Sequence, residues 1–243
     1  MKKFWVNELE SGYYDKLFQN GIKNSRGFQA NWHLTTFTHI KEYLNKDLNH
    51  LDYACGPGTL IGNFSLSESI GVDLSQKQIA YAQEKYPKFK FVGLEDFQFK
   101  DFQHKFHVIT VLGLFEFLSE EEINEHLNRF FYMLRDGGKL IITTPNFSVF
   151  LRALLFLSQL IGKTKYNSLY VSKFKRKNLI TFLEKQQTFD LVKVKNFINA
   201  GSLLSIFSHK FSKKLEQTVS SYSSDKYGLL LLAELRKNNL KSI

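Results

Sequence analysis

The chain of 243 residues has one cysteine, three prolines and no uncharged apolar run long enough to span a bilayer. The single cysteine, Cys55, excludes an internal disulfide and suits a reducing compartment. With 43% hydrophobic residues and so little proline, the composition favours one globular domain over a disordered chain. Acidic residues interrupt the apolar residues near the start, so we expect no signal peptide and a cytoplasmic protein.

Two common nucleotide-binding fingerprints are also missing. A dinucleotide site of the G-x-G-x-x-G type would need glycine at position 61, but Ile61 stands there and Gly62 comes one residue late. The phosphate-binding pattern G-x-x-x-x-G-K-S/T is absent as well. These absences disfavour a nicotinamide dinucleotide and a nucleoside triphosphate as ligand.

What the chain does have is a glycine-rich turn over residues 51–59, between an apolar run and a segment that can begin a helix. An acid is followed there by small residues at alternate positions, in the order Asp52, Ala54, Gly56 and Gly58. Small residues let the backbone approach a ligand closely, and such strand-to-helix turns commonly hold a nucleotide or nucleoside. An ordinary tight turn is the alternative. Cys55 has no evident base beside it and is interpreted as a small packing residue.

A second acid, Asp73, ends the short apolar strand that follows. A carboxylate at this distance from the turn reaches ribose hydroxyls in doubly wound folds. Ser75 is expected to cap the helix over 76–86, which stops before Pro87. With the cap assigned to Ser75, Asp73 stays available for a ligand.

These segments resemble the cofactor site of class I S-adenosylmethionine (SAM) methyltransferases, near the type 11 group. Asp52 to Gly58 is similar to their motif D/E-x-G-x-G-x-G, with Ala54 at the first glycine, and five landmarks follow in order over 51–146. The resemblance implies SAM as cofactor, S-adenosylhomocysteine as product and no metal. It gives Asp73 the ribose and Leu74 the adenine face. The cofactor-binding residues that it implies are Asp52, Ala54, Cys55, Gly56, Gly58, Asp73, Leu74, Asp96, Phe97, Leu112 and Gly113.

The adenine side departs from the family pattern. Leu94 stands where many relatives carry the acid that accepts from the adenine amino group, so this role passes to Glu95 or Asp96. We favour Asp96, with Phe97 packing on the ring. A solvated acidic turn remains the alternative.

The catalytic residue is left open. Residues 112–118 resemble the loop at the methionine end of SAM, but Phe117 stands where relatives that methylate hydroxyls often have a histidine base. Residues 13–15 resemble the family's Y-Y-D opening, in which a tyrosine approaches the SAM carboxylate; a surface tyrosine pair is the alternative. Candidates for a catalytic role are Tyr14, His33, Glu116, Tyr166 and Tyr170.

The resemblance implies an α/β, Rossmann-like doubly wound sheet of seven strands in the order 3-2-1-4-5-7-6, with the last strand antiparallel. The apolar patterns predict strands over 106–112, 139–144, 189–198 and 227–236, with a glycine turn over 134–138 and a helix over 177–187. One domain covers 1–243. Its parts are an N-terminal helical cap (1–48), a cofactor core (49–146), a lid or insertion (147–176) and the C-terminal part of the sheet (177–243).

Charge is distributed unevenly. Residues 1–138 hold 15 basic and 18 acidic side chains, net −3, whereas residues 139–243 hold 18 basic and 5 acidic, net +13. The apolar stretch 147–161 could be a core helix, a lid over an apolar substrate or a membrane-interface helix. The stretch 203–215 is amphipathic with lysines. Because anionic lipid surfaces attract such segments, peripheral membrane contact is expected at both, a solvated charged face being the alternative.

The sequence thus predicts in-line methyl transfer from SAM to a small apolar or lipid-linked acceptor, at oxygen or carbon. The alternatives are an inactive SAM-binding or membrane-interaction module and a nucleic-acid methyltransferase. Nucleic acid is disfavoured because residues 112–115 do not match the (N/D)-P-P-(Y/F) signature of the amino-methylating enzymes. The Pro-Cys pair needed for cytosine C5 chemistry is also absent.

Overall fold

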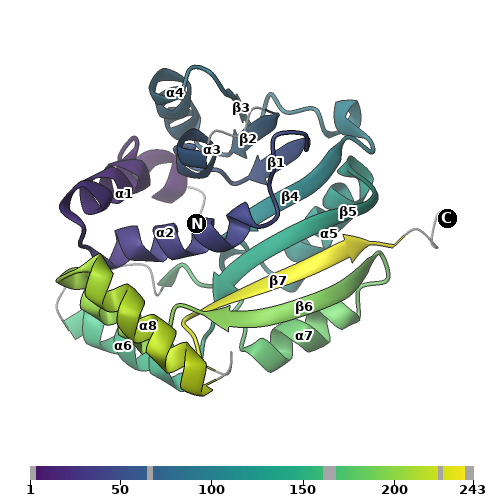
Figure 1. Cartoon of the computed structure of the whole chain (residues 1–243). Helices are drawn as coiled ribbons and strands as arrows, with labels where there is room; N and C mark the ends of the chain where they lie inside the picture. Colours follow the sequence, from purple (N-terminus) through teal and green to yellow (C-terminus); the bar gives the residue numbers. More distant parts are fainter. Residues whose placement is uncertain (1–3, 65–67, 161–167, 224–226, 239–243) are drawn as a thin grey trace.

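A seven-stranded sheet runs through the protein in the computed structural model, which describes residues 4–64, 68–160, 168–223 and 227–238 (Figure 1). Its order is β3-β2-β1-β4-β5-β7-β6, with β7 antiparallel to both neighbours and the other pairs parallel. The predicted sheet is confirmed. The strands are β1 (His50–Tyr53), β2 (Ser69–Asp73), β3 (Lys90–Gly93), β4 (Phe106–Leu112), β5 (Leu134–Pro145), β6 (Phe189–Phe197) and β7 (Leu230–Lys237).

Helices cover both faces of the sheet. The α-helices are α1 (Tyr13–Asn24), α2 (Phe28–Lys41), α3 (Thr59–Phe64), α4 (Gln76–Lys85), α5 (Glu120–Met133), α6 (Val149–Leu160), α7 (Arg176–Glu184) and α8 (His209–Ser223). Short turns of helix are η1 (Phe4–Glu8, π) and the 3₁₀ turns η2 (Phe99–Phe102), η3 (Phe115–Phe117) and η5 (Ala200–Ile206). Helices on both faces explain why the central strands are apolar throughout rather than alternating.

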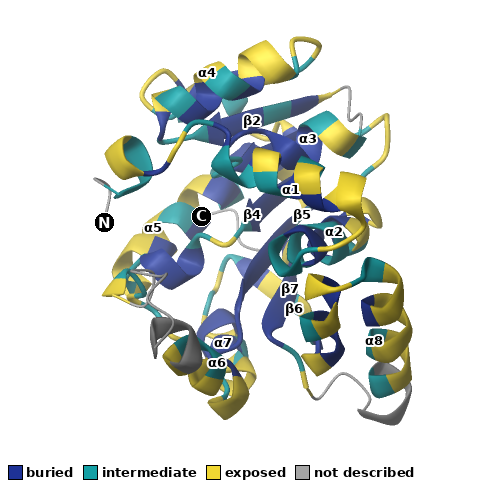
Figure 2. Ribbon diagram, turned by 90° about the vertical axis from the view of Figure 1, so that its left-hand side faces the viewer, coloured by how far each residue is buried: buried dark blue, intermediate teal, exposed yellow. Residues whose placement is uncertain are grey.

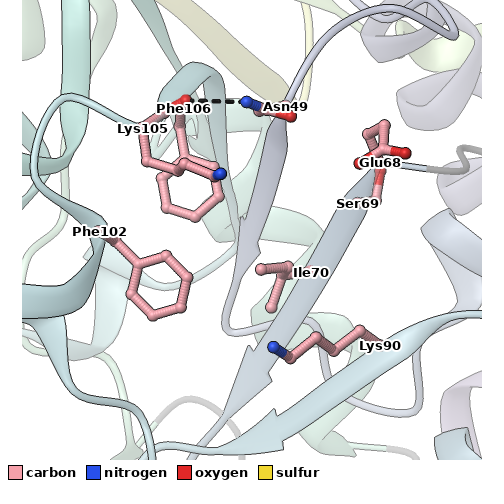
Figure 3. Close-up of a pocket in the computed structure, with 8 residues that line it drawn as sticks. All are labelled: Asn49, Glu68, Ser69, Ile70, Lys90, Phe102, Lys105 and Phe106. Atoms are coloured by element: carbon pink, nitrogen blue, oxygen red, sulfur yellow. Dashed lines mark hydrogen bonds between the residues drawn. The ribbon is translucent and has the colours of Figure 1, made fainter.

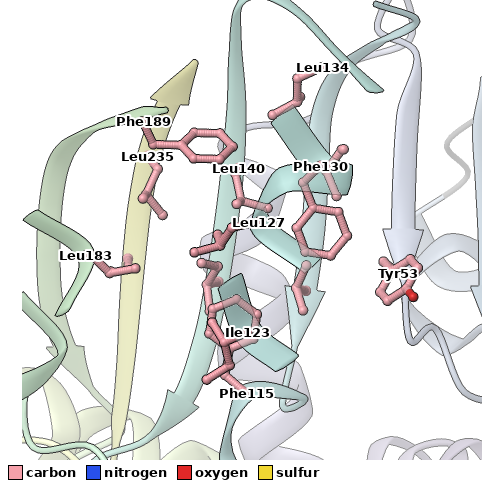
Figure 4. Close-up of a cluster of buried hydrophobic side chains, with 14 of the residues drawn as sticks. Tyr53, Phe115, Ile123, Leu127, Phe130, Leu134, Leu140, Leu183, Phe189 and Leu235 are labelled. Carbon is pink, nitrogen blue, oxygen red and sulfur yellow. The ribbon is translucent and has the colours of Figure 1, made fainter. Parts of the chain in front are cut away.

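The core has two main layers, one on each face of the sheet. Alternate residues of β5 divide between them: Leu140 faces the layer that contains α5 and α7, and Ile141 faces the layer that contains α1, α2 and α6. Figure 4 shows the first layer, where Leu127 of α5 lies near Leu140. The sheet is therefore held rigidly from both sides, and the carboxyl ends of β1, β2, β4 and β5 are fixed along one edge.

Helix α1 is tied to α4 beside that edge. Gly12 donates its backbone N–H to Gln78 Oε1 at 2.9 Å. The buried Asp15 carboxylate accepts from Tyr81 at 2.9 Å and from Tyr86 at 2.7 Å. Of the Y-Y-D residues, the acid thus has an anchoring role, since a buried carboxylate is stable only when it is hydrogen-bonded.

Four sequence expectations are corrected. Residues 134–138 belong to β5, which bulges at Gly137 (φ 68°) against β4, rather than forming a separate turn. The stretch 203–215 is divided between η5 and α8, and does not form one helix. Ser75 occupies the N-cap position of α4, but its side chain makes no cap hydrogen bond and its Oγ is buried without a partner among the described residues. The predicted ends of several elements shift by one to three residues, with β7 beginning at Leu230.

The apolar stretch 147–161 is only partly buried. Phe147 and Leu151 belong to the core, whereas Val149, Phe150 and Phe156 are exposed. In the part of the chain that the structure describes, every helix is too short or too polar to cross a membrane. The subdivision of the chain into cap, core and lid stays a prediction.

Candidate functional site

The loop between β1 and α3 leaves space for a ligand at one glycine. Ala54, Gly56 and Gly58 all have positive φ, at 64°, 54° and 74°. A Cβ on Gly58 would come within 2.5 Å of the Phe91 ring, whereas a Cβ on Gly56 would meet nothing within 4 Å. Gly58 is therefore required by packing, and Gly56 presents open backbone toward solvent. Burial raises the pKa of the Cys55 thiol well above its usual value, which agrees with a packing role.

Asp73 holds this loop in place. Its Oδ2 accepts from the Gly56 backbone N–H and its Oδ1 from the Ser75 N–H, both at 2.8 Å. Burial raises the pKa of Asp73, and the two backbone hydrogen bonds oppose that rise. Each carboxylate oxygen has a second lone pair, so Asp73 retains the capacity to accept from two hydroxyls of a ribose.

Asp52 is the innermost acid of the site and ends a chain of polar residues across three strands. Its Oδ1 accepts from Thr110 Oγ1 of β4 at 2.7 Å. Thr110 Oγ1 lies 2.8 Å from His50 Nε2, and His50 Nδ1 lies 3.0 Å from Ser69 Oγ. Because Thr110 donates to Asp52, it accepts from His50 Nε2–H, which leaves Nδ1 as the acceptor from Ser69.

Burial sets the protonation of this chain. It lowers the pKa of His50 to about 3, so the ring is neutral, as its fixed tautomer requires. Burial also raises the pKa of Asp52 to about 7, with the charge of Asp73 adding to the rise. Sequence reasoning missed His50 and Thr110. The sequence feature that could have indicated them is a polar residue within each of two apolar strands, His50 in β1 and Thr110 in β4.

The adenine side is less well defined. Asp96 is exposed and accepts from Gln76 Nε2 at 3.3 Å. Phe97 is 4% exposed and stacks on Phe102 at 4.6 Å between centroids, so its ring belongs to the core. Leu94, half-buried, follows β3 and donates its N–H to the Asp73 carbonyl at 2.9 Å. The adenine roles of Leu74, Asp96 and Phe97 stay predictions.

At the end of β4, Leu112 leads into a second open glycine. Gly113 has φ 72°, and a Cβ there would meet only Glu116 Oε1, at 3.4 Å. Glu116 is 4% exposed, and its Oε2 accepts from Thr144 Oγ1 of β5 at 3.3 Å. Burial raises the pKa of Glu116 to about 8, so this carboxyl is largely protonated at neutral pH.

Four rings from separate segments form an aromatic cluster near Glu116. They are Trp5, Phe117, Phe147 and Tyr170. Phe117 meets Trp5 edge-on at 4.9 Å and stacks on Tyr170 at 5.5 Å, and Tyr170 meets Phe147 at 5.1 Å. The Glu116 carbonyl accepts from the next residue of the Tyr170 segment, Val171, at 2.8 Å. The segment after α6 is thereby attached to the end of β4.

Two other sequence candidates lie together on the N-terminal helices. The Tyr14 ring meets His33 edge-on at 5.7 Å, and His33 stacks on Phe37 at 5.6 Å. Burial lowers the pKa of His33 to about 4, and its Nε2 has no partner among the described residues. A neutral imidazole of such low pKa is a weak base. Tyr166 lies outside the described residues.

A cavity of about 370 Å³ lies at the opposite edge of the sheet (Figure 3). It is lined by residues at the amino ends of the strands, among them Asn49, Ser69, Lys90 and Phe106. None of the motif residues lines it. Ligands of doubly wound sheets bind at the carboxyl edge, so this cavity is not the candidate site.

Ala54→Gly should raise the free energy of unfolding by up to about 1 kcal/mol. A left-handed conformation costs a residue with Cβ about 1–2 kcal/mol, and glycine's greater freedom in the unfolded chain offsets roughly 0.5–1 kcal/mol of the relief. Urea denaturation measures the change. The control is Ala80→Gly on the exposed side of α4, where glycine should lower stability. An equal loss of stability in both variants would show that Ala54 carries no strain.

Comparison with known proteins agrees with this geometry. A model of the "Methyltransferase domain" family matches residues 51–138, which contain the loop, Asp73 and Glu116. A search of curated proteins finds no match.

Solved structures share the fold over most of the chain. A SAM-dependent methyltransferase from Archaeoglobus fulgidus is 17% identical, with a TM-score of 0.57 over 84% of this chain and 92% of that one. Magnesium protoporphyrin IX methyltransferase from Synechocystis, with bound S-adenosylhomocysteine, is 14% identical, with a TM-score of 0.54 over 97% and 92%. Geranyl diphosphate C-methyltransferase from Streptomyces coelicolor is 12% identical, with a TM-score of 0.57 over 94% and 84%. At these identities the likeness establishes the fold alone.

The residues present fit SAM. Open backbone at Gly56 and Gly113 leaves room for it, and Asp73 retains acceptor capacity that suits ribose hydroxyls. That Asp52 also binds the cofactor stays a prediction. The described residues contain no group of three or more His, Cys, Asp or Glu that could hold a metal ion. That the reaction needs no metal stays a prediction. With the family match over residues 51–138, this part of the chain is a methyltransferase domain, and its fold is that of the SAM-dependent methyltransferases.

Proposed function

We propose that the protein transfers the SAM methyl group to oxygen or carbon of a small apolar or lipid-linked acceptor. The aromatic cluster, next to a carboxyl that is largely uncharged at neutral pH, carries this proposal. Rings and a neutral acid favour an apolar molecule with one or two polar groups, since burying a charged acceptor there would be costly.

SAM supplies an activated methyl group when it is bound. The chain then has to align the acceptor, hold it in line and exclude water. Gly56 and Asp73 hold the nucleoside end, Asp52 the methionine end, and the aromatic cluster lies where β4 and β5 end. Protonated Glu116 is suited to donate a hydrogen bond to an acceptor oxygen rather than to remove a proton. Acceptors that need little base help, such as an acidic phenol, a carboxylic acid or a carbanion-like carbon, agree best with this.

Two of the similar structures support an organic acceptor by name: the methyltransferases for geranyl diphosphate and for magnesium protoporphyrin IX. The alternative of a catalytically inactive SAM-binding or membrane-interaction module requires that catalysis has been lost, and no specific observation favours that loss. The open backbone at Gly56 and the remaining acceptor capacity of Asp73 support SAM binding. A nucleic-acid acceptor likewise lacks a supporting feature at the aromatic cluster.

A label-transfer assay tests the acceptor class. With methyl-labelled SAM and a total cell extract, we expect label in the organic phase after solvent partition. Tyr170→Ala should raise the acceptor KM roughly tenfold, because an aromatic contact and its buried area are lost. The affinity for SAM should not change.

The matched control is Tyr227→Ala, which removes a tyrosine that is 71% exposed and outside the cluster. It should leave the acceptor KM unaffected. Label found in nucleic acid, or equal KM values for the two variants, would contradict an apolar acceptor at the cluster. SAM binding without any label transfer would support the inactive module.

A further inference from the structure

An exposed apolar surface lies on η5 and the start of α8. Phe207 is 78% exposed, Phe211 67% and Ile206 54%, and Leu204 and Leu215 are also exposed. We call these five residues, with Lys210, Lys213 and Lys214, the η5–α8 face. Phe211 and Leu215 are four apart in α8, so their side chains project from one side of that helix, and Phe207 lies in the turn just before it. Figure 2 shows α8 at the lower end of the molecule with most of its outward side exposed.

The inner side of this element is already packed against the rest of the protein. Ser212 is fully buried and lies 3.4 Å from Asn31 Nδ2 of α2. A Cβ on Gly201 would come 2.8 Å from the Glu216 backbone nitrogen, so η5 and α8 are in close contact. The η5–α8 element therefore cannot turn to bury Phe207 and Phe211 without losing these contacts. Their exposure is a property of the fold.

The charge around the apolar residues has one sign. Lys210, Lys213 and Lys214 are exposed, and Glu216 is the one acid between residues 200 and 223. Glu216 is half-buried, and burial raises its pKa to about 7, so its negative charge is incomplete at neutral pH. The face consequently presents positive charge beside exposed rings.

The connection between α1 and α2 extends the same surface. His209 donates its N–H to the Ser25 carbonyl at 2.8 Å, and the Gly27 N–H donates to Ser205 O at 2.6 Å. This connection brings the exposed residues Ile22, Lys23 and Arg26 to the same end of α8. Figure 1 shows the α1–α2 connection meeting the start of α8.

We propose that the η5–α8 face docks on an anionic membrane surface, with Phe207 and Phe211 entering the lipid interface and the lysines contacting lipid phosphates. Apolar side chains flanked by lysines match such a surface in both polarity and charge. A second copy of the chain is a poorer partner, because two faces of the same positive charge repel each other. Helix α6 also exposes Phe150 and Phe156, but Arg152 is its one basic residue.

Docking in this way would serve the proposed function, on which this part of the inference rests. The face is joined to α2 through Gly27, and α2 carries His33 beside Tyr14 of α1. An acceptor dissolved in the bilayer would then be held on the same side of the protein as these N-terminal helices.

Vesicle co-sedimentation of the whole protein tests the proposal without requiring turnover. We expect binding to phosphatidylcholine vesicles that contain phosphatidylglycerol, weak binding to phosphatidylcholine alone, and release at high salt. The triple variant Lys210→Gln, Lys213→Gln, Lys214→Gln should lower the partition coefficient on the order of 100-fold. The double variant Phe207→Ser, Phe211→Ser should lower it at least about tenfold.

The matched control is Phe150→Ser, Phe156→Ser on α6, which removes two exposed rings from a helix whose one basic residue is Arg152. It should leave the partition coefficient unchanged, and SAM affinity should be preserved in all three variants, which shows that they fold. Equal binding to both kinds of vesicle, or an equal loss in the α6 control, would overturn the proposal. So would a concentration-dependent dimer that the Phe207→Ser, Phe211→Ser variant abolishes. If docking fails in any of these ways, label transfer to a water-soluble acceptor would still show that the protein is a methyltransferase.

Discussion

Asp73→Ala should weaken SAM binding about 100-fold or more. Without the carboxylate, bound SAM would lose two charge-assisted hydrogen bonds from its ribose, each worth about 1.5–3 kcal/mol. It would also release the Gly56 N–H, which it now holds at 2.8 Å, so the loop would no longer be fixed for the ligand. Titration calorimetry with SAM measures the loss, and Asp73→Asn should retain part of the affinity because its amide oxygen still accepts.

Asp96→Ala is the matched control for this loss. Asp96 is exposed and has one long hydrogen bond, at 3.3 Å from Gln76, so its removal should cost no more than roughly tenfold. Comparable losses at Asp73 and Asp96 would contradict the ribose assignment. A dissociation constant for Asp73→Ala within threefold of the unmodified protein would do so too.

The affinity for SAM should rise with pH up to about pH 7 and then level off. Burial holds the pKa of Asp52 at about 7, so at lower pH the carboxyl is protonated and cannot pair with the cationic methionine end. Binding must then release a proton, which weakens the apparent affinity by about tenfold for each pH unit below the pKa. Calorimetry in two buffers of different ionisation enthalpy measures the proton released.

The titration of Asp52 affects the stability of the free protein in the opposite direction to the SAM affinity. In the free protein the pKa of Asp52 is raised above its unfolded value, so its contribution to stability is greatest at low pH and is lost as the pH rises through about 7. SAM should therefore stabilise the protein most at and above neutral pH.

The matched control for the pH effect is Asp52→Asn, which cannot titrate. Its SAM affinity should be low and nearly independent of pH between 5.5 and 7.5. A slope that persists in Asp52→Asn would assign the proton to another group, for which Asp73, whose pKa burial also raises, is the first candidate.

The strand order and the cofactor loop could be predicted because they depend on local patterns. Buried parallel strands give continuous apolar runs, and a loop that approaches a ligand needs small residues at fixed spacing. The polar chain from Ser69 through His50 and Thr110 to Asp52 could not be predicted, because it depends on the register between three strands. The replacement of the motif's first glycine by Ala54 likewise did not indicate that this residue has a left-handed backbone conformation.

The division at 203–215 was missed for a similar reason. Amphipathic spacing predicts a helix but does not locate a break within it, and here η5 ends at Ile206 and α8 begins at His209. The anchoring of Asp15 by Tyr81 and Tyr86 joins residues that are 66 and 71 positions apart. Sequence spacing alone carries no information about such a contact.

The position of β7 has a consequence for synthesis of the chain. This strand is the last in sequence, yet it lies between β5 and β6 and pairs with both, from Pro145↔Leu230 on one side to Phe189↔Lys237 on the other. Until residues 230–237 leave the ribosome, β5 has an open edge and β6 has no partner in the sheet. Open strand edges invite pairing with other chains. The nascent protein is thus most vulnerable to aggregation just before its final strand is made, long after the SAM-binding part of the sheet can have paired.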